Sequence, residues 1–232
     1  MPEEQLLLPL QSDADVRLDD LPAAAFADVR SALDQLAAGS LRQLHIWGPP
    51  GSGRSLLLRA VLAEAPAHFQ RPLLLPLREV LTWSPELLEG LEHCDLVVLD
   101  DIDAVAGWPD WEEALFNLYN RLQDSGSRLL VTAATPPAGL PLTLPDLRSR
   151  LARASSHALP VPDDDVRREL LGVTAQRRGW ALDDDVARTL IARGPRRLGD
   201  FLRLLDQLDA RALRERRALT LPLLRSLLPD LA

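Results

Sequence analysis

A glycine-rich octapeptide, Gly48-Pro-Pro-Gly-Ser-Gly-Arg-Ser55, carries the clearest chemical signal in the sequence. Its spacing, G-x-x-x-x-G-[K/R]-S, is typical of a phosphate-binding P-loop. Glycines let consecutive backbone N–H groups converge on an anion, and a helix that begins after the loop adds favourable partial charge. The alternative is a plain glycine turn between a strand and a helix. The residues that would hold a nucleotide are Gly48, Gly51, Ser52, Gly53, Arg54 and Ser55.

Position 54 holds arginine, where a P-loop normally carries lysine. All 26 basic residues of the chain are arginine, so a general preference for arginine is one explanation. Arginine keeps the positive charge and the phosphate-matching donors, but its planar fork is larger than a compact ammonium. We therefore expect Arg54 to support nucleotide binding, with weak or no ATP hydrolysis by this chain alone.

Two carboxylates form the second half of the expected site. Asp100 and Asp101 follow the apolar run Leu96-Val-Val-Leu99, which is typical of a buried parallel strand. This pattern matches a Walker B strand, whose first acid helps to hold Mg²⁺. We expect Asp100 and Ser55 to hold the metal and Asp101 to polarise the attacking water. Asp101 is one methylene shorter than the glutamate common at this position, and an acidic surface turn is the alternative for both residues.

The elements that must position these residues alternate along the first two thirds of the chain. This alternation predicts an α/β fold with a parallel five-stranded sheet flanked by helices. We expect helices over 23–38, 56–65, 84–93 and 108–124, and strands over 44–47, 71–77, 96–99, 128–134 and around 157–161.

The remainder of the sequence reads only as helices, over about 163–178, 183–193, 196–211 and 221–228. We therefore expect three parts: a flexible tail over 1–12, an α/β nucleotide-binding domain over 13–161 and a small all-α domain over 162–232. If the last domain folds over the nucleotide, an arginine near the start of its third helix would contact the phosphates. Arg196 is the residue we expect there, and an ordinary surface charge is the alternative.

Composition narrows the class of protein. The net charge of −8 argues against a general nucleic-acid surface, so any contact with DNA is expected to be indirect. The single cysteine, Cys94, excludes an intramolecular disulfide and fits a reducing compartment. No apolar run approaches the ~18 residues that a membrane span needs, and the acidic start is unlike a secretory signal. We expect a soluble, cytoplasmic protein without a membrane partner.

The order of these motifs resembles that of an AAA+ ATPase with a helical lid. More narrowly, the chain resembles the DnaA/Hda branch of bacterial replication proteins, and the similarity covers essentially its whole length. Three features favour the Hda type, the regulatory inactivator, over an initiator with a helix-turn-helix domain. They are an arginine in the P-loop, a motif near the start that resembles a sliding-clamp-binding hexapeptide, and an end just past the lid. The supporting stretches are 114–122, Pro145-Asp-Leu-Arg-Ser-Arg-Leu151 and Leu205-Asp-Gln-Leu-Asp209.

This resemblance implies a mechanism in trans. The chain would bind ADP (or ATP) with Mg²⁺ and present Arg150 as an arginine finger to the ATP site of DnaA. DnaA would then hydrolyse its ATP and could not re-initiate replication. Arg148 is the alternative finger. The family also places the segment at Leu21 and Pro22 against adenine, and a polar γ-phosphate sensor where this chain has Ala134, a role that Thr132 could serve in part.

The start of the chain carries an apolar motif, Gln5-Leu-Leu-Leu-Pro-Leu10. Exposed leucines on a free tail are unfavourable unless a groove buries them. The motif resembles the hexapeptide by which many bacterial replication proteins dock on the sliding clamp. That resemblance implies that Gln5 bonds the groove rim and that Leu6, Leu8 and Leu10 supply the apolar contact; packing of the tail on its own domain is the alternative.

Two other functions fit parts of the same pattern. One is an autonomous ATPase that loads a clamp or a helicase, against which Arg54, Asp101 and Ala134 count. The other is a clamp adaptor in which Arg150 has no catalytic part. AAA+ relatives are compatible with a homodimer or a mixed assembly, between which the sequence does not choose.

Overall fold

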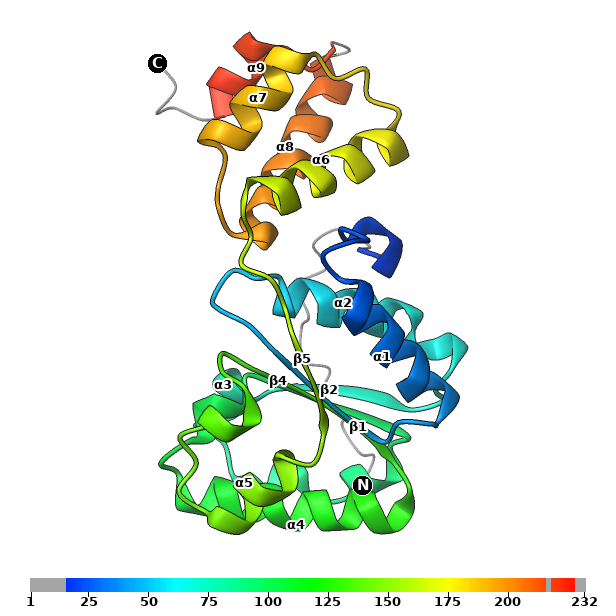
Figure 1. The fold of residues 1–232 in the computed structure, drawn as a ribbon, viewed down its shortest axis with the longest axis vertical. Coiled ribbons are helices and arrows are strands. Elements are labelled where there is room, and N and C mark those ends of the chain that lie inside the picture. The colour runs from blue at the N-terminus through cyan, green and yellow to red at the C-terminus, as the bar shows by residue number, and fades with distance from the viewer. Residues whose placement is uncertain (1–15, 216–217, 228–232) are drawn as a thin grey trace, which may run out of the picture.

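A five-stranded sheet forms the centre of the molecule in a computed structural model, which describes residues 16–215 and 218–227 (Figure 1). The strand order is β2-β3-β4-β1-β5, and every neighbouring pair is parallel. This confirms the predicted α/β fold with a parallel five-stranded sheet. The strands are β1 (Gln43–Trp47), β2 (Pro72–Pro76), β3 (Leu96–Asp100), β4 (Arg128–Ala133) and β5 (Ser155–Ala158).

Helices cover both faces of this sheet. On one face lie α1 (Ala27–Ala38) and α2 (Arg54–Glu64), and on the other lie α3 (Leu77–Val80), α4 (Pro109–Ser125) and α5 (Pro145–Leu151) (Figure 1). Alternate residues of a strand point to opposite faces, so Leu96 and Val98 join the first hydrophobic cluster while Val97 and Leu99 join the second. A strand buried on both sides must be apolar at every position, which explains the continuous apolar run.

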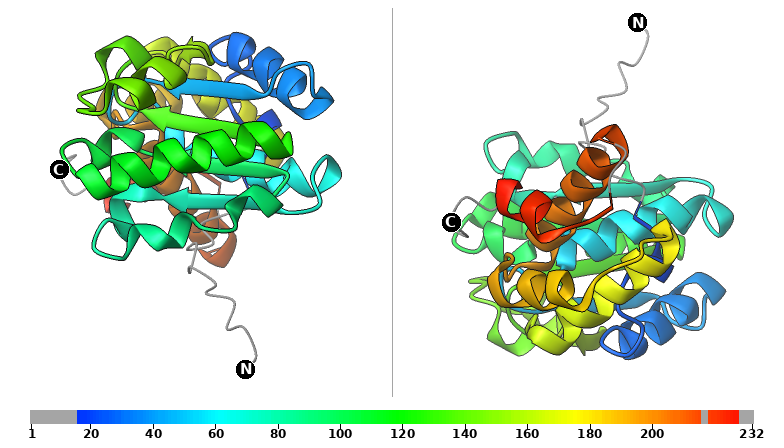
Figure 2. Two further views of the ribbon diagram at one scale, coloured as in Figure 1. Left: turned by 90° about the horizontal axis from the view of Figure 1, so that it is seen from below. Right: turned by 90° about the horizontal axis from the view of Figure 1, so that it is seen from above.

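Four helices form a lid beyond α2: α6 (Asp164–Arg178), α7 (Asp184–Arg193), α8 (Leu198–Glu215) and α9 (Leu221–Leu227). Seen from above in Figure 2, they lie over the side of the sheet that carries α2. Asp163 and Asp183 cap α6 and α7 by accepting bonds from backbone N–H groups two residues on. Phe201 and Leu205 of α8 share one hydrophobic cluster with Phe26 and Leu56, so the lid and the sheet domain are packed together. The predicted boundary between 161 and 162 falls between β5 and α6.

Three predicted helices differ clearly from the structure. The helix expected over 196–211 is α8, which begins two residues later and ends at Glu215. The stretch 84–93 is not one helix, because Gly90 has a φ of 77° and separates two short 3-10 helices. Ser84 accepts a bond from the backbone N–H of Glu86 and so caps the first of these two short helices. The helix expected from residue 23 begins at Ala27, after a turn. The 3-10 helices are η1 (Leu18–Asp20), η2 (Ala65–Ala67), η3 (Pro85–Leu88), η4 (Leu91–His93), η5 (Ile102–Val105) and η6 (Pro137–Gly139).

Across residues 16–215 and 218–227, none of the helices combines the length and the apolar character that crossing a membrane requires.

Candidate nucleotide-binding site

The glycine-rich loop connects the end of β1 to the start of α2, as the P-loop pattern predicted. Gly51 and Gly53 have φ values of 89° and 98°, which side chains of L-residues rarely adopt. A Cβ at Gly51 would also lie 2.8 Å from Cγ of Arg197, which comes from the lid. Backbone conformation and close approach both require glycine at this turn.

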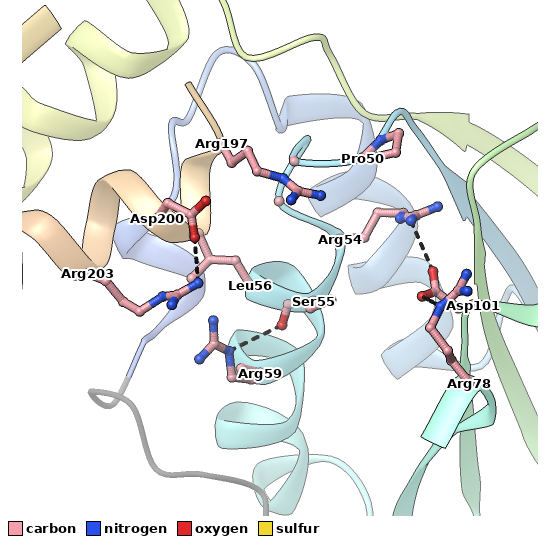
Figure 3. A pocket seen from close by; sticks show the side chains of 13 residues that line it. Pro50, Arg54, Ser55, Leu56, Arg59, Arg78, Asp101, Arg197, Asp200 and Arg203 are labelled. Atoms are coloured by element: carbon pink, nitrogen blue, oxygen red, sulfur yellow. Dashed lines mark hydrogen bonds and ion pairs between the residues drawn. The ribbon is translucent and has the colours of Figure 1, made fainter. Parts of the chain in front are cut away.

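A cavity of about 460 Å³ opens between this loop and α8 (Figure 3). Its volume lies within the range of small-molecule sites. Five arginines and two aspartates line it, so its charge favours an anionic ligand such as a polyphosphate. The charged lining residues are Arg54, Arg59, Arg78, Arg197, Arg203, Asp101 and Asp200; Pro50, Gly51, Gly53, Ser55, Leu56 and Gly199 complete the lining.

Arg54 is the P-loop cation, and only 12% of its side chain is exposed. Its Nη2 lies 3.0 Å from a carboxylate oxygen of Asp101. Its buried Nη1 has no hydrogen-bond partner among the described residues. A buried cationic donor without a partner is unfavourable, and an oxygen of a bound phosphate would satisfy it. The residues present therefore fit a nucleotide phosphate.

The predicted metal-binding residues lie side by side. Ser55 Oγ donates to Asp100 Oδ2 over 3.4 Å, and Thr132 Oγ1 donates to the other oxygen of Asp100. The register that pairs Leu99 with Val131 places Asp100 level with Thr132 on the neighbouring strand. Burial raises the pKa of Asp100, although the bond from Thr132 lowers it. A carboxylate whose charge is disfavoured by burial is a suitable partner for a cation.

Ser55 and Asp100 alone would leave most of a metal's coordination sphere to other ligands. No group of three or more His, Cys, Asp or Glu side chains within the described ranges is arranged to hold a metal. Mg²⁺ commonly takes one or two protein ligands and completes its shell with phosphate oxygens and water. Ser55 and Asp100 therefore fit Mg²⁺ that arrives with a nucleotide.

Asp101, the predicted base, is engaged on both oxygens. One oxygen meets Arg54, and the other lies 3.2 Å from Nε of Arg78 (Figure 3). The residue has a φ of 56°, and its backbone N–H donates to Thr132 Oγ1. Each oxygen of Asp101 therefore already accepts from an arginine, which leaves fewer acceptor positions for a water. Arg78, from α3, had no sequence pattern to mark it.

Among the described residues, two lid arginines line the cavity, Arg197 and Arg203; Arg196, the residue predicted from the sequence, does not line it. Arg196 is 70% exposed and lies 3.1 Å from Asp164 at the start of α6, away from the cavity. Arg197 packs on Gly51, and the backbone N–H of Leu198 donates to the carbonyl of Gly51. Because α8 begins at Leu198, the residue just before the helix reaches the loop while its predecessor turns back to α6.

Other predicted site residues lie elsewhere. Leu21 and Pro22 are buried, and Leu21 packs in the hydrophobic cluster with Phe26; neither lines the cavity as described. Ser52 is fully buried beneath the loop. The backbone N–H of Ala134 donates to Asp103, so this position offers a main-chain contact only. Gln5, Leu6, Leu8 and Leu10 lie outside the described residues.

Arg150 is at the end of α5, on the opposite side of the sheet from α2 (Figure 1). Its guanidinium lies over the rings of Phe116 and Tyr119, at 5.3 Å and 5.5 Å, and donates to Gln123. Arg150 is half-buried against α4 and Arg148 is exposed. Neither is among the described residues that line the cavity.

Comparison with known proteins agrees with this geometry. Residues 44–157 match the model of the ATPase family associated with various cellular activities (AAA), and residues 164–228 match the model of the Hda lid domain. Domain III of the Thermotoga maritima replication initiation protein DnaA aligns with a TM-score of 0.75 and 18% identity, over 94% of this chain and 97% of that one.

Two further solved structures share the fold. AMPPCP-bound DnaA from Aquifex aeolicus aligns with a TM-score of 0.67 and 17% identity, over 85% of this chain and 66% of that one. The Thermotoga maritima RuvB Holliday junction branch migration motor aligns with a TM-score of 0.66 and 18% identity, over 93% and 72%. At these identities the alignments show the fold alone.

Proposed function

The chain is a DnaA-related AAA+ protein with an Hda-type lid, and from this premise we propose that it regulates the initiation of DNA replication by stimulating ATP hydrolysis by DnaA. The relevant arginine is Arg150. Its place on the far side of the sheet from its own cavity carries the proposal, because this arginine cannot serve the nucleotide that its own chain holds.

Arg150 supplies a charge that phosphoryl transfer needs. Charge spreads over the oxygens of the transferred phosphoryl group, and an arginine finger from a second protein stabilises it, with rate effects of about 10³–10⁵. The guanidinium rests on two aromatic rings at the surface of α4, where it can extend towards a partner. Arg148, two residues earlier on a different face of α5 and exposed, is the alternative finger.

The chain's own nucleotide acts as a scaffold in this proposal. ADP or ATP, with Mg²⁺, binds through Arg54, Ser55 and Asp100, and Arg197 brings the lid against the same loop. Asp101 remains between Arg54 and Arg78, an arrangement suited to holding a nucleotide more than to turning it over. The same proposal accounts for the departures from the usual ATPase residues at Arg54 and Ala134, since a protein that completes a partner's site does not need an efficient site of its own.

We also propose that residues 5–10 tether the chain to a sliding clamp. A tether raises the effective concentration of Arg150 near DnaA without adding contacts at the catalytic interface. Changing Gln5, Leu6 and Leu8 to alanine should abolish clamp binding and leave ADP binding intact. If the triple variant still binds the clamp, the anchor lies in another part of the chain.

The proposal as a whole is tested by ATP turnover. ATP-bound DnaA is incubated with clamp loaded on DNA, with and without this chain, and released phosphate is measured. Faster turnover only when the chain is present supports the proposal, and an unchanged rate contradicts it.

An autonomous ATPase is the second function that a specific observation favours. Ser55 and Asp100 lie side by side, an arrangement that would suit Mg²⁺ bound with a nucleotide in hydrolysis as well as in binding. This function requires appreciable turnover by the purified chain without DnaA, which the same phosphate assay measures. A clamp adaptor without catalytic effect would bind the clamp and leave DnaA turnover unchanged.

A further inference from the structure

Glu112 is a buried carboxylate in the first part of α4, and only 1% of the residue is exposed. Its Oε1 accepts from the backbone N–H groups of Gly107 and Thr143, at 3.0 Å and 3.1 Å. Its Oε2 accepts from the hydroxyl of Thr143 and the N–H of Leu144, at 2.9 Å and 2.6 Å. Burial opposes ionisation, yet these bonds hold the pKa of Glu112 below its ordinary value. The carboxylate is thus fully satisfied by neutral donors from two separate segments.

The segment that Glu112 holds is the start of α5. Leu144 is the residue that precedes this helix, and its carbonyl accepts from the N–H of Arg148. A helix of seven residues does not hold its position by its own hydrogen bonds, since isolated helices shorter than ~12 residues are marginal. Contacts from outside must therefore fix where α5 begins.

The same face of α4 holds the other end of α5. Phe116, Tyr119 and Gln123 follow Glu112 at helical spacings of about four, three and four residues, so the four side chains share one stripe. Phe116 and Tyr119 lie beneath the guanidinium of Arg150, and Gln123 accepts from it. Tyr119 also donates to the side chain of Gln43 and to the backbone carbonyl of Arg150. One stripe of α4 thus contacts this segment from Leu144, just before α5, to Arg150 near the end of the helix.

We propose that Glu112 is a positioning residue for Arg150. By bonding Thr143 and Leu144 to α4, it fixes the position of α5 and so of the arginine that α5 presents. The role of Arg150 in this inference rests on the function proposed above. The placement of the Arg150 side chain over the ring of Tyr119 does not depend on that function and is measured separately.

A carboxylate suits this site because three of the four partners are backbone N–H groups, which can only donate. In Glu112→Gln the amide NH₂ would face one or two of these N–H groups and leave them without an acceptor, although the hydroxyl of Thr143 could turn to accept from it. Thr143→Val is a milder change that removes only the hydroxyl bond, and Thr143→Ser retains it. These two variants keep the proposal testable if Glu112→Gln fails to fold.

The first experiment needs no partner. The chain has one tyrosine, so labelling with ¹³C-tyrosine gives the ring signals of Tyr119 alone. Arg150→Ala defines the signal of a ring without the guanidinium. Glu112→Gln and Thr143→Val should move the signal towards that reference, whereas Thr143→Ser and Glu113→Gln, at an exposed neighbour, should leave it unchanged. A wild-type ring signal in folded Glu112→Gln and Thr143→Val would overturn the proposal.

The second experiment measures stimulated turnover of DnaA. Misplacement of a catalytic group by about 1 Å costs up to about 10²-fold in rate. Glu112→Gln should lower the maximal stimulated rate at least about tenfold, with the half-saturating concentration of the chain and its ADP affinity unchanged. Thr143→Ser should match wild type where Thr143→Val does not.

The outcomes separate the two claims. If wild type does not stimulate DnaA, the proposed function fails, and the Tyr119 signal still decides whether Glu112 positions Arg150. If Glu112→Gln changes only the half-saturating concentration, the segment that Glu112 holds belongs to a docking surface, and the positioning role for Arg150 is wrong.

Discussion

Nη2 of Arg54 lies 3.0 Å from Oδ1 of Asp101, so the P-loop cation and the predicted catalytic base are paired with each other. The other nitrogen of the same fork, Nη1, has no partner among the described residues. A compact lysine ammonium has no second, fixed arm of this kind. The arginine can thus hold Asp101 with one nitrogen while the other is left for a phosphate oxygen.

Arg54→Ala should therefore weaken ADP binding by about 10- to 100-fold, the effect of losing a hydrogen bond to a charged group. Isothermal titration calorimetry with ADP and Mg²⁺ measures the change. Arg71→Ala, at an exposed arginine that does not line the cavity, is the matched control. An Arg54→Ala variant with wild-type affinity would show that the phosphate does not contact this residue.

The two adjacent lid arginines should behave differently. Arg197→Ala should weaken ADP binding by about tenfold or more, because Arg197 lines the cavity. Arg196→Ala should change the affinity little, since its partner is Asp164 on the lid surface. Titration with a fluorescent ADP analogue compares the two variants. The placement of Arg197 would be contradicted if Arg196→Ala had the larger effect.

Much of the fold could be predicted because its signals are local. The P-loop spacing and the apolar run before Asp100 each depend on residues close in sequence. The break at Gly90 was missed because a single glycine does not by itself end a helical pattern.

The site was harder to predict where tertiary contacts decide which of two adjacent residues reaches the cavity. Arg196 and Arg197 have the same side chain, and only the position of α8 against Gly51 separates them. Arg78 and Glu112 carry no local pattern for these contacts, because Asp101 is 23 residues from Arg78, and Thr143 and Leu144 are 31 and 32 residues from Glu112. The buried hydroxyl of Thr132 joins Asp100 to Asp101 only through strand register.

Thr132→Val should lower the free energy of unfolding by about 1–3 kcal/mol, because it leaves the N–H of Asp101 and the carboxylate of Asp100, both partly buried, short of a partner. It should also reduce the Mg²⁺ dependence of nucleotide affinity, since Asp100 would lose its orientation. Urea unfolding and ADP titration with and without Mg²⁺ measure both effects. Thr132→Ser keeps the hydroxyl and should retain most of the stability; equal losses in both variants would assign the effect to packing.

The pH dependence of stability should include a contribution from His45. This residue is fully buried on β1, and desolvation lowers its pKa from 6.5 to about 4. Between pH 6.5 and about 4 the unfolded chain binds a proton that the folded chain does not. Stability from this group is therefore complete above pH 6.5 and declines as the pH falls, by up to about 3 kcal/mol. Urea unfolding at pH 7.5 and pH 5 should show a smaller difference for His45→Leu than for wild type, and equal differences would rule out this contribution.

The central claim is that Arg150 acts on a nucleotide held by another protein. The most direct measurement is the rate of ATP hydrolysis by DnaA, with clamp on DNA, in the presence of wild type, Arg150→Ala or Arg153→Ala. Arg153 is an exposed arginine just beyond α5 and provides a matched control. We expect stimulation to be lost in Arg150→Ala, by about 10³-fold or to the unstimulated rate, and to persist in Arg153→Ala, with clamp and ADP binding intact in both. Full stimulation by Arg150→Ala would contradict the account.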